Sequence, residues 1–232
     1  MTSNKFTAPV ALLTGQTSEH IIWLSERIGI HQLILNPWQQ LQQAANKAGF
    51  DLQIASGFRS FERQLALWNN KFSGKSIVKS KDNQPIDLTQ CSDTERINAI
   101  LLFSALPGAS RHHWGTDIDV YAPNLLKHNQ NLQLEPWEYQ QDGPFEKLSI
   151  WLKENSLLYG FYSPYDKDRG GVAIEPWHLS YAPLASQFQQ QLTVAQLTHA
   201  IKHSNLLAKS CVLDNLANIY KKFIINVNNA PS

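Results

Sequence analysis

Apolar side chains recur at helical spacing in several parts of the chain. Phe61, Leu65 and Trp68 lie three or four positions apart and would occupy one face of a helix that runs from Ser60 to Phe72. The same spacing, together with helix-capping residues, predicts further helices over residues 18–29, 36–49 and 92–105, from residue 143 onward, and over most of the chain after residue 193.

Two stretches alternate between polar and apolar side chains, which is typical of half-buried strands. They cover residues 50–55 and residues 116–121. In the second stretch Asp117 and Asp119 would share one face, while the intervening Ile118 would enter the core. The alternation therefore predicts a strand that carries two carboxylates on its polar face.

Polar segments without periodicity separate these elements. Residues 73–91 and 122–141 are predicted to be irregular, and a short strand is predicted after a loop at 162–171, leading into Glu175. No repeat, low-complexity tract or linker divides the 232 residues. We therefore expect one α+β domain, with a small, mainly antiparallel sheet flanked by helices and a helical extension over residues 190–232.

Composition narrows the possible partners. The formal net charge is +1, and basic residues are scattered among acids, so neither nucleic acid nor an anionic membrane is indicated. No stretch approaches the ~20 apolar residues of a membrane span, and the run Val10–Leu13 is shorter than the ~7–15 residues of a secretory signal core. A cytoplasmic protein is expected. Cys91 and Cys211 could form one disulfide, but two free thiols are the expected state, and nothing in the sequence indicates the oligomeric state.

Candidate metal ligands gather in the stretch Ser-Arg-His-His-Trp-Gly-Thr-Asp-Ile-Asp at residues 110–119. Gly115 would permit a tight backbone reversal that returns His112 over the polar face of the strand, next to Asp119. In isolation, adjacent histidines in a turn are more often solvated surface side chains than ligands. With a third ligand, however, such a set would suit Zn²⁺ and leave a fourth position to water.

The segment Glu175-Pro-Trp-His178 offers that third ligand and a base. Pro176 would hold Glu175 in an extended conformation, so that its carboxylate could take a proton from a metal-activated water. The alternative for Glu175 is a surface carboxylate at a strand end. Trp177 is expected to be a core aromatic whatever the function, and it is also a candidate substrate contact.

A third segment, Ser-Gly-Phe-Arg-Ser-Phe-Glu-Arg-Gln at residues 56–64, offers a cation. Arg59 falls at a strand-to-helix junction, where its fixed fork of donors would suit a substrate carboxylate or a developing oxyanion. Gln64 lies about one turn into the helix and could bind the same group. Alone, Arg59 would more often form a surface ion pair.

Together the three segments resemble the zinc D-Ala-D-Ala carboxypeptidases of the VanY and VanX type. That family shares its metal-site architecture with lysostaphin-like enzymes and the hedgehog signalling domain. The resemblance extends over roughly residues 50–182, and the motifs occur in the order of the family. The matching positions are Gly57, Phe58, Arg59, Ser60, Gln64, Ser110, His112, Gly115, Asp119, Glu175 and His178.

The resemblance implies one Zn²⁺ per chain, held by His112, Asp119 and His178, with Glu175 as the catalytic base. The substrate's terminal carboxylate or the oxyanion would be held by side chains of the other motifs, namely Arg59, Ser110 and Gln64. The implied reaction is release of a C-terminal D-amino acid, with D-Ala expected, from peptidoglycan stem peptides.

Three other functions are compatible with the same motifs. A D-Ala-D-Ala dipeptidase and a peptidoglycan endopeptidase would share this architecture, and a zinc-stabilised binding module would lack catalysis. The last is disfavoured because structural zinc needs neither Glu175 as a base nor Arg59 beside an open position.

The chain departs from the family pattern at Asp117, where alanine is common. Asp117 could orient a ligating histidine, contact a substrate amine, or compete as a ligand. His113 is a second ambiguity, since it neighbours His112, and the family register favours His112.

Overall fold

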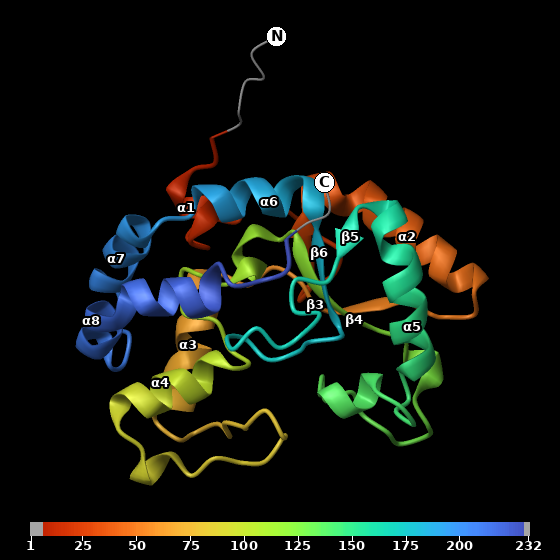
Figure 1. Cartoon of the computed structure of the whole chain (residues 1–232). Helices are drawn as coiled ribbons and strands as arrows, with labels where there is room; N and C mark the ends of the chain where they lie inside the picture. The colour runs from red at the N-terminus through yellow and green to blue at the C-terminus, as the bar shows by residue number, and fades with distance from the viewer. Residues whose placement is uncertain (1–6, 230–232) are drawn as a thin grey trace.

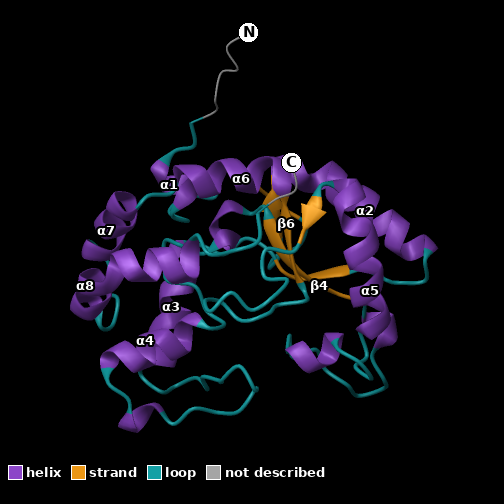
Figure 2. Ribbon diagram, viewed as in Figure 1, coloured by secondary structure: helices purple, strands orange, loops and turns teal. Residues whose placement is uncertain are grey.

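The computed structural model describes residues 7–229, and at its centre lies a four-stranded antiparallel sheet with helices packed around it (Figures 1 and 2). The strand order is β3-β4-β6-β5, and β1 and β2 form a separate hairpin. The strands are β1 (Ile21–Trp23), β2 (Gly29–His31), β3 (Gln53–Ser56), β4 (Asp117–Tyr121), β5 (Phe161–Tyr162) and β6 (His178–Tyr181). The helices are α1 (Val10–Leu13), α2 (Leu35–Lys47), α3 (Phe61–Phe72), α4 (Asp93–Leu101), α5 (Glu146–Asn155), α6 (Ala182–Gln191), α7 (Val194–Lys202) and α8 (Lys209–Ile219). The predicted α+β class is thereby confirmed.

Capping side chains set the beginning of several helices where the sequence predicts them. The Ser60 hydroxyl accepts a hydrogen bond from the Arg63 N–H at the start of α3. A capping box joins Ser92 and Glu95 at the start of α4, and Thr193 forms a second capping box at α7. These bonds satisfy backbone N–H groups that the first helical turn leaves free.

The two faces of the central sheet differ sharply in chemistry. Ile118 and Leu179 are paired across β4 and β6, and both are buried against α2 and α5. The other face carries Asp117, Asp119 and His178. A strand alternates its side chains between faces, so the apolar packing of one face fixes the direction in which the polar set on the other face points.

The C-terminal helices belong to a second apolar core. Leu197 of α7 and Leu216 of α8 are buried in the same cluster as Trp68 of α3 and Ile100 of α4. The helices of the predicted extension are therefore present, and they share this core with helices from the first half of the chain; residues 230–232 lie outside the described part. Asp119 and His178 line one cavity together with Lys71 of α3 and Leu101 of α4, so the polar face of the sheet is turned toward these helices. Figure 1 shows α3 and α4 on the other side of the sheet from α2 and α5.

The helix predicted over residues 18–29 is wrong, because the segment forms the β1–β2 hairpin. Ile21 and Trp23 favour extended backbone, and the Ser25 hydroxyl accepts hydrogen bonds from the N–H groups of residues 27 and 28 in the turn. Gly29 does not end a helix but lies in β2, where a Cβ atom would come within 2.6 Å of the Ile21 side chain.

The strand predicted to lead into Glu175 is also wrong, because β6 begins at His178. Residues 175–178 form a turn in which the His178 N–H donates to the Glu175 carbonyl at 3.1 Å. Pro176 favours this turn and has no N–H for a sheet ladder. Smaller differences occur at helix ends, since α2 starts at Leu35 rather than at residue 36, and α4 ends at Leu101 rather than at residue 105.

Between residues 7 and 229 the structure contains no helix with the length and apolar character to cross a bilayer. The N-terminal stretch in which no secretory signal is predicted lies partly outside the described residues. Cys91 and Cys211 are free, as expected.

Candidate active site

Strand register places an imidazole opposite a carboxylate on the polar face of the sheet. His178 of β6 pairs with Asp119 of β4, and His178 Nδ1 lies 3.2 Å from Asp119 Oδ1. Directly opposed residues of antiparallel strands have neighbouring side chains. The pairing of β4 with β6 thus joins two motifs that are far apart in the sequence.

A tight reversal at Gly115 brings His112 to the same place, as the sequence predicts. His112 lies in the short 3₁₀ helix η3 (Arg111–Trp114), which ends at Gly115 with φ of 66°. A Cβ atom at Gly115 would come within 2.8 Å of the His31 backbone nitrogen. Glycine is therefore required both by the left-handed backbone and by the space available.

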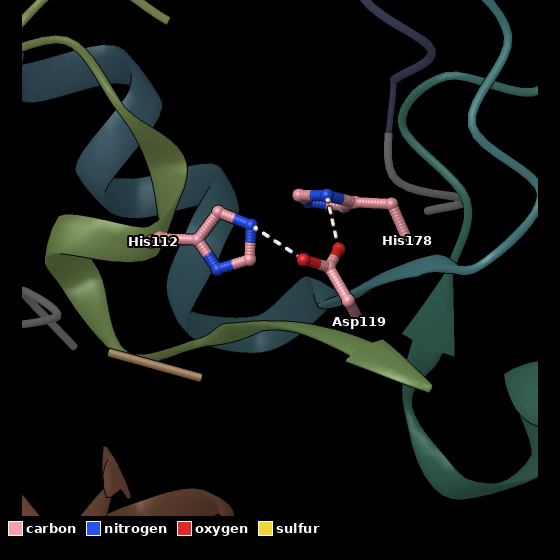
Figure 3. A group of neighbouring side chains, drawn as sticks. All are labelled: His112, Asp119 and His178. Carbon is pink, nitrogen blue, oxygen red and sulfur yellow. Dashed lines mark ion pairs between the residues drawn. The ribbon is translucent and has the colours of Figure 1, made fainter. Parts of the chain in front are cut away.

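Hydrogen bonding fixes which His112 nitrogen faces the cluster. Nδ1 lies 2.9 Å from the Gly57 carbonyl oxygen and donates to it. The lone pair of Nε2 is then free, and Nε2 lies 3.4 Å from Asp119 Oδ2. Figure 3 shows both imidazoles directed at the Asp119 carboxylate.

These three side chains offer a donor set for one metal ion. One ligand atom each from His112, Asp119 and His178 lie within 4.8 Å of one another, and all three residues are buried. Asp119 Oδ1 and His178 Nδ1 have no hydrogen-bond partner among the described residues, which is rare for buried polar atoms. A cation that accepts a lone pair from each would satisfy both atoms, and two imidazole nitrogens with one carboxylate suit Zn²⁺.

Asp117 holds the His178 ring from behind. His178 Nε2 donates to Asp117 Oδ1 at 3.0 Å, which turns Nδ1 toward Asp119. Asp117 is fully buried, and it also accepts hydrogen bonds from Arg111 Nε at 2.7 Å and the Thr116 hydroxyl at 2.8 Å. Its contacts are those of a residue that orients a ligating histidine.

Arg111 also belongs to the site, although the sequence motifs assign it no role. It is buried and donates to Asp117, to Gln189 Oε1 at 2.5 Å, and to the hydroxyls of Ser180 at 2.8 Å and Tyr162 at 3.2 Å. All three nitrogens of its guanidinium donate hydrogen bonds, and its charge neutralises the buried Asp117 carboxylate. The available signal was Asp117 itself, since a carboxylate on a buried face needs a buried cation.

The carboxylates shape the protonation of the cluster. Burial raises the pKa of Asp117, but the guanidinium of Arg111 and the hydrogen bond from His178 outweigh burial and hold it well below its usual range. Burial lowers the pKa of His178, yet Asp117, Asp119 and Glu175 around the ring outweigh burial and raise it well above its ordinary value. The surroundings of His178 therefore favour positive charge.

Glu175 lies beside the ligand cluster without joining it. The turn at residues 175–178 places Glu175 Oε2 3.3 Å from His178 Nδ1. Burial raises the pKa of its carboxyl, an effect that the interaction with His178 partly offsets. A carboxyl so placed can exchange a proton with a group held at the metal site.

Arg59 reaches the cavity while Gln64 holds it in place. Arg59 Nη1 donates to Gln64 Oε1 at 2.9 Å, and Nη2 donates to the Ser56 hydroxyl at 3.1 Å. The Gln64 amide in turn donates to the Ala105 carbonyl at 2.6 Å. The contacts of Gln64 are thus with Arg59 and the backbone.

A cavity of about 410 Å³ opens onto the cluster. Gln64 and Asp117 do not line it, although the sequence suggested substrate contact for both. Trp177 is buried, and its ring packs 5.7 Å from that of Tyr139, yet it also reaches the cavity wall. The predicted site residues that line the cavity are Arg59, Ser110, His112, Asp119, Glu175, Trp177 and His178.

His113 has a structural role instead. Its Nε2 accepts from the Gly108 N–H at 3.0 Å, and its Nδ1 donates to the Arg59 carbonyl at 2.6 Å. Both nitrogens are therefore used away from the ligand cluster, and the ring packs closely against Gly15.

Glu135 joins the two loops that border the cavity. Its carboxylate pairs with Lys79 and accepts a hydrogen bond from Asn83 Nδ2 at 2.5 Å. All three residues line the cavity, so this ion pair fixes one of its walls. No motif in the sequence pointed to it.

Comparison with known proteins supports the family resemblance that the sequence motifs indicate. The model of the family described as "VanY: D-alanyl-D-alanine carboxypeptidase" matches residues 27–184. An uncharacterised protein of Haemophilus influenzae is 42% identical over 122 residues, which cover 52% of this chain and 93% of that protein. The bifunctional D-Ala-D-Ala dipeptidase and carboxypeptidase VanXYC of Enterococcus gallinarum is 23% identical over 205 residues, covering 87% of this chain and 88% of that protein.

Two solved structures share the fold. VanYB in complex with D-Ala-D-Ala superposes with a TM-score of 0.54 at 22% identity, covering 82% of this chain and 92% of that one. A VanY mutant from a VanB-type resistance cassette in complex with Zn(II) gives a TM-score of 0.51 at 22% identity, covering 84% and 91%.

Proposed function

Because this chain belongs to the VanY D-alanyl-D-alanine carboxypeptidase family, we propose that it is a zinc-dependent peptidase that releases C-terminal D-Ala from peptidoglycan stem peptides. The observation that carries this proposal is the buried cluster of His112, Asp119 and His178, in which Asp119 Oδ1 and His178 Nδ1 have no hydrogen-bond partner, with Glu175 beside it. The proposed ligands are those three residues. Bound zinc would supply Lewis acidity, which lowers the pKa of a water and polarises the scissile carbonyl.

Glu175 serves as general base and then as general acid. Its carboxylate takes a proton from the attacking water and passes it to the leaving amine. Burial raises the pKa of its carboxyl, so the carboxyl holds the transferred proton more readily than an exposed glutamate would. Ser110 lines the cavity beside His112 and offers a hydroxyl to the substrate.

Arg59 provides positive charge for the substrate carboxylate or the oxyanion. Gln64 and Ser56 hold its fork in one orientation. Lysine would keep the charge and lose the planar fork. Arg59→Lys is expected to lower kcat/KM roughly 10- to 100-fold, as for the loss of a charge-assisted hydrogen bond worth about 1.5–3 kcal/mol. Arg63→Lys, on the exposed side of α3, is the matched control. An unchanged kcat/KM in Arg59→Lys would remove Arg59 from this role.

Of the three roles open to Asp117, we propose the orienting one. Asp117→Asn keeps the size of the side chain and removes the charge that fixes His178. Zinc affinity is expected to fall about 10- to 100-fold, measured by competition with a chromophoric chelator. The variant should also unfold at lower temperature, because Arg111 loses its buried partner. Asp214→Asn on the surface of α8 is the control, and zinc binding as tight as in the native protein would contradict the proposal.

Product analysis tests the reaction itself. The purified protein is incubated with tetrapeptide and pentapeptide stems and with D-Ala-D-Ala, with and without a chelator, and the products are identified by mass spectrometry. The proposal predicts loss of one D-Ala from the pentapeptide, abolished by the chelator. Cleavage of the free dipeptide would indicate a dipeptidase, and internal cleavage an endopeptidase. No product from any substrate would contradict a peptidase.

A further inference from the structure

Four lysine and arginine side chains line the cavity, and they fall into two pairs. Lys79 is paired with Glu135, and Arg111 is paired with Asp117. Within the described residues no carboxylate lies at ion-pair distance from the other two, Arg59 and Lys71. Burying a cation without a counter-charge is costly. Arg59 and Lys71, the two cations without an ion-pair partner in the described part of the chain, therefore mark the part of the cavity that would bind an anion.

Helix α3 carries both Lys71 and Gln64, the residue that holds Arg59. Gln64, Leu67 and Lys71 recur at helical spacing along one face of α3. Gln64 holds Arg59, while Leu67 and Lys71 line the cavity themselves. Seven residues of α-helix rise about 10 Å. Lys71 therefore lies about two helical turns further along the cavity wall than the residue that fixes Arg59.

Residues 104 and 105, which lie next to α3, contact both Gln64 and Lys71. The Ala105 carbonyl accepts from Gln64 at 2.6 Å, and the neighbouring Ser104 hydroxyl lies 2.6 Å from Lys71 Nζ. An ammonium has three donors, so the hydroxyl leaves donors free for a ligand in the cavity. Leu101 and Leu106, which flank this segment, also line the wall and suit a small apolar side chain.

Among the described residues, the charges around Lys71 also lack a close anion. Burial lowers the pKa of Lys71, and the positive charge of Arg59 lowers it further, while Glu175 raises it. A bound carboxylate would stabilise the charged form of this lysine. A lysine in the last turn of a helix can also simply complement the helix dipole. Lys47 occupies that position on α2 and is exposed, whereas Lys71 is half-buried at the cavity.

We propose that Lys71 binds the free α-carboxylate of the substrate's C-terminal residue, which leaves Arg59 to face the scissile carbonyl. This inference rests on the proposed peptidase function and narrows it. A site that reads a terminal carboxylate favours removal of the last residue over cleavage within a chain.

The test compares two peptides in the zinc-loaded, full-length protein. One is a stem pentapeptide ending in D-Ala-D-Ala with a free carboxylate, and the other is the same peptide with a C-terminal amide. The native protein is expected to prefer the free acid in kcat/KM. In Lys71→Met this preference should fall at least tenfold, mainly through a higher KM for the free acid, and Lys71→Arg should restore most of it. Lys47→Met is the matched control and should keep the native preference.

The measurements distinguish failure of the carboxylate site from failure of the proposed peptidase function. Zinc content and the thermal unfolding midpoint establish that the Lys71→Met protein is folded. A folded Lys71→Met protein that keeps the native preference for the free acid would overturn the carboxylate site, as would a native protein that cleaves acid and amide equally well. A native protein that releases nothing from either peptide would overturn the proposed function itself.

Discussion

Replacing Glu175 by glutamine is expected to lower kcat about 10²- to 10⁴-fold, the contribution typical of a general base, while zinc content stays at the native level. Glutamine has nearly the same shape but cannot accept the proton. Glu175 is outside the set of three ligand atoms that lie within 4.8 Å of one another. It contacts that set only through His178. Chemistry and metal binding should therefore separate at this position.

The measurement pairs steady-state kinetics on the pentapeptide with metal analysis of the same preparation. Glu154→Gln, on the exposed side of α5, is the control and should behave as native. Equal rates for Glu175→Gln and the native protein would remove Glu175 from the mechanism. Loss of zinc in the variant would place Glu175 among the ligands instead.

Replacing His178 by alanine is expected to remove most of the zinc and all measurable turnover. His178 is one of the three proposed ligands, and its ring lies between two buried carboxylates, Asp117 and Asp119. Without the imidazole, only His112 and Asp119 of the proposed ligands remain for the cation. A zinc site with an open catalytic position needs three protein ligands.

Metal content by mass spectrometry and folding by circular dichroism are measured together for His178→Ala. His128→Ala changes an exposed histidine and should keep both zinc and activity. A folded His178→Ala protein with undiminished zinc would refute the ligand assignment.

The local sequence pattern predicts those parts of the site that depend on residues close together in the sequence. The alternation through Ile118 predicts which face of β4 carries Asp117 and Asp119, and Gly115 predicts the return of His112. Both follow from backbone geometry over a few positions. The order of three motifs then predicts the family, which the family match confirms.

The sequence does not predict contacts between residues that are far apart in the chain. The antiparallel register of β4 with β6, which sets Asp119 opposite His178, depends on strands with more than fifty residues between them. The Arg111–Asp117 pair lies across a turn with no periodic signal. Local spacing also misled at residues 18–29, where a helical repeat of apolar residues coincides with a strand-forming run at Ile21–Trp23.

Tertiary packing decides the roles of Gln64 and Lys71 as well. Both lie on α3, and the sequence singles out only Gln64, through its motif. The structure turns Gln64 toward Arg59 and puts Lys71 at the cavity wall. Which helical residue reaches a cavity depends on what packs beside the helix, here the segment at Ser104.

Metal-dependent release of terminal D-Ala by this cluster can be measured by titrating zinc into chelator-treated protein while following D-Ala release from the pentapeptide. We expect no release without metal and a rise in rate that stops at one zinc per chain. Glu175→Gln should bind the same amount of zinc and remain inactive. Full D-Ala release by the metal-free protein would show that the reaction does not depend on zinc.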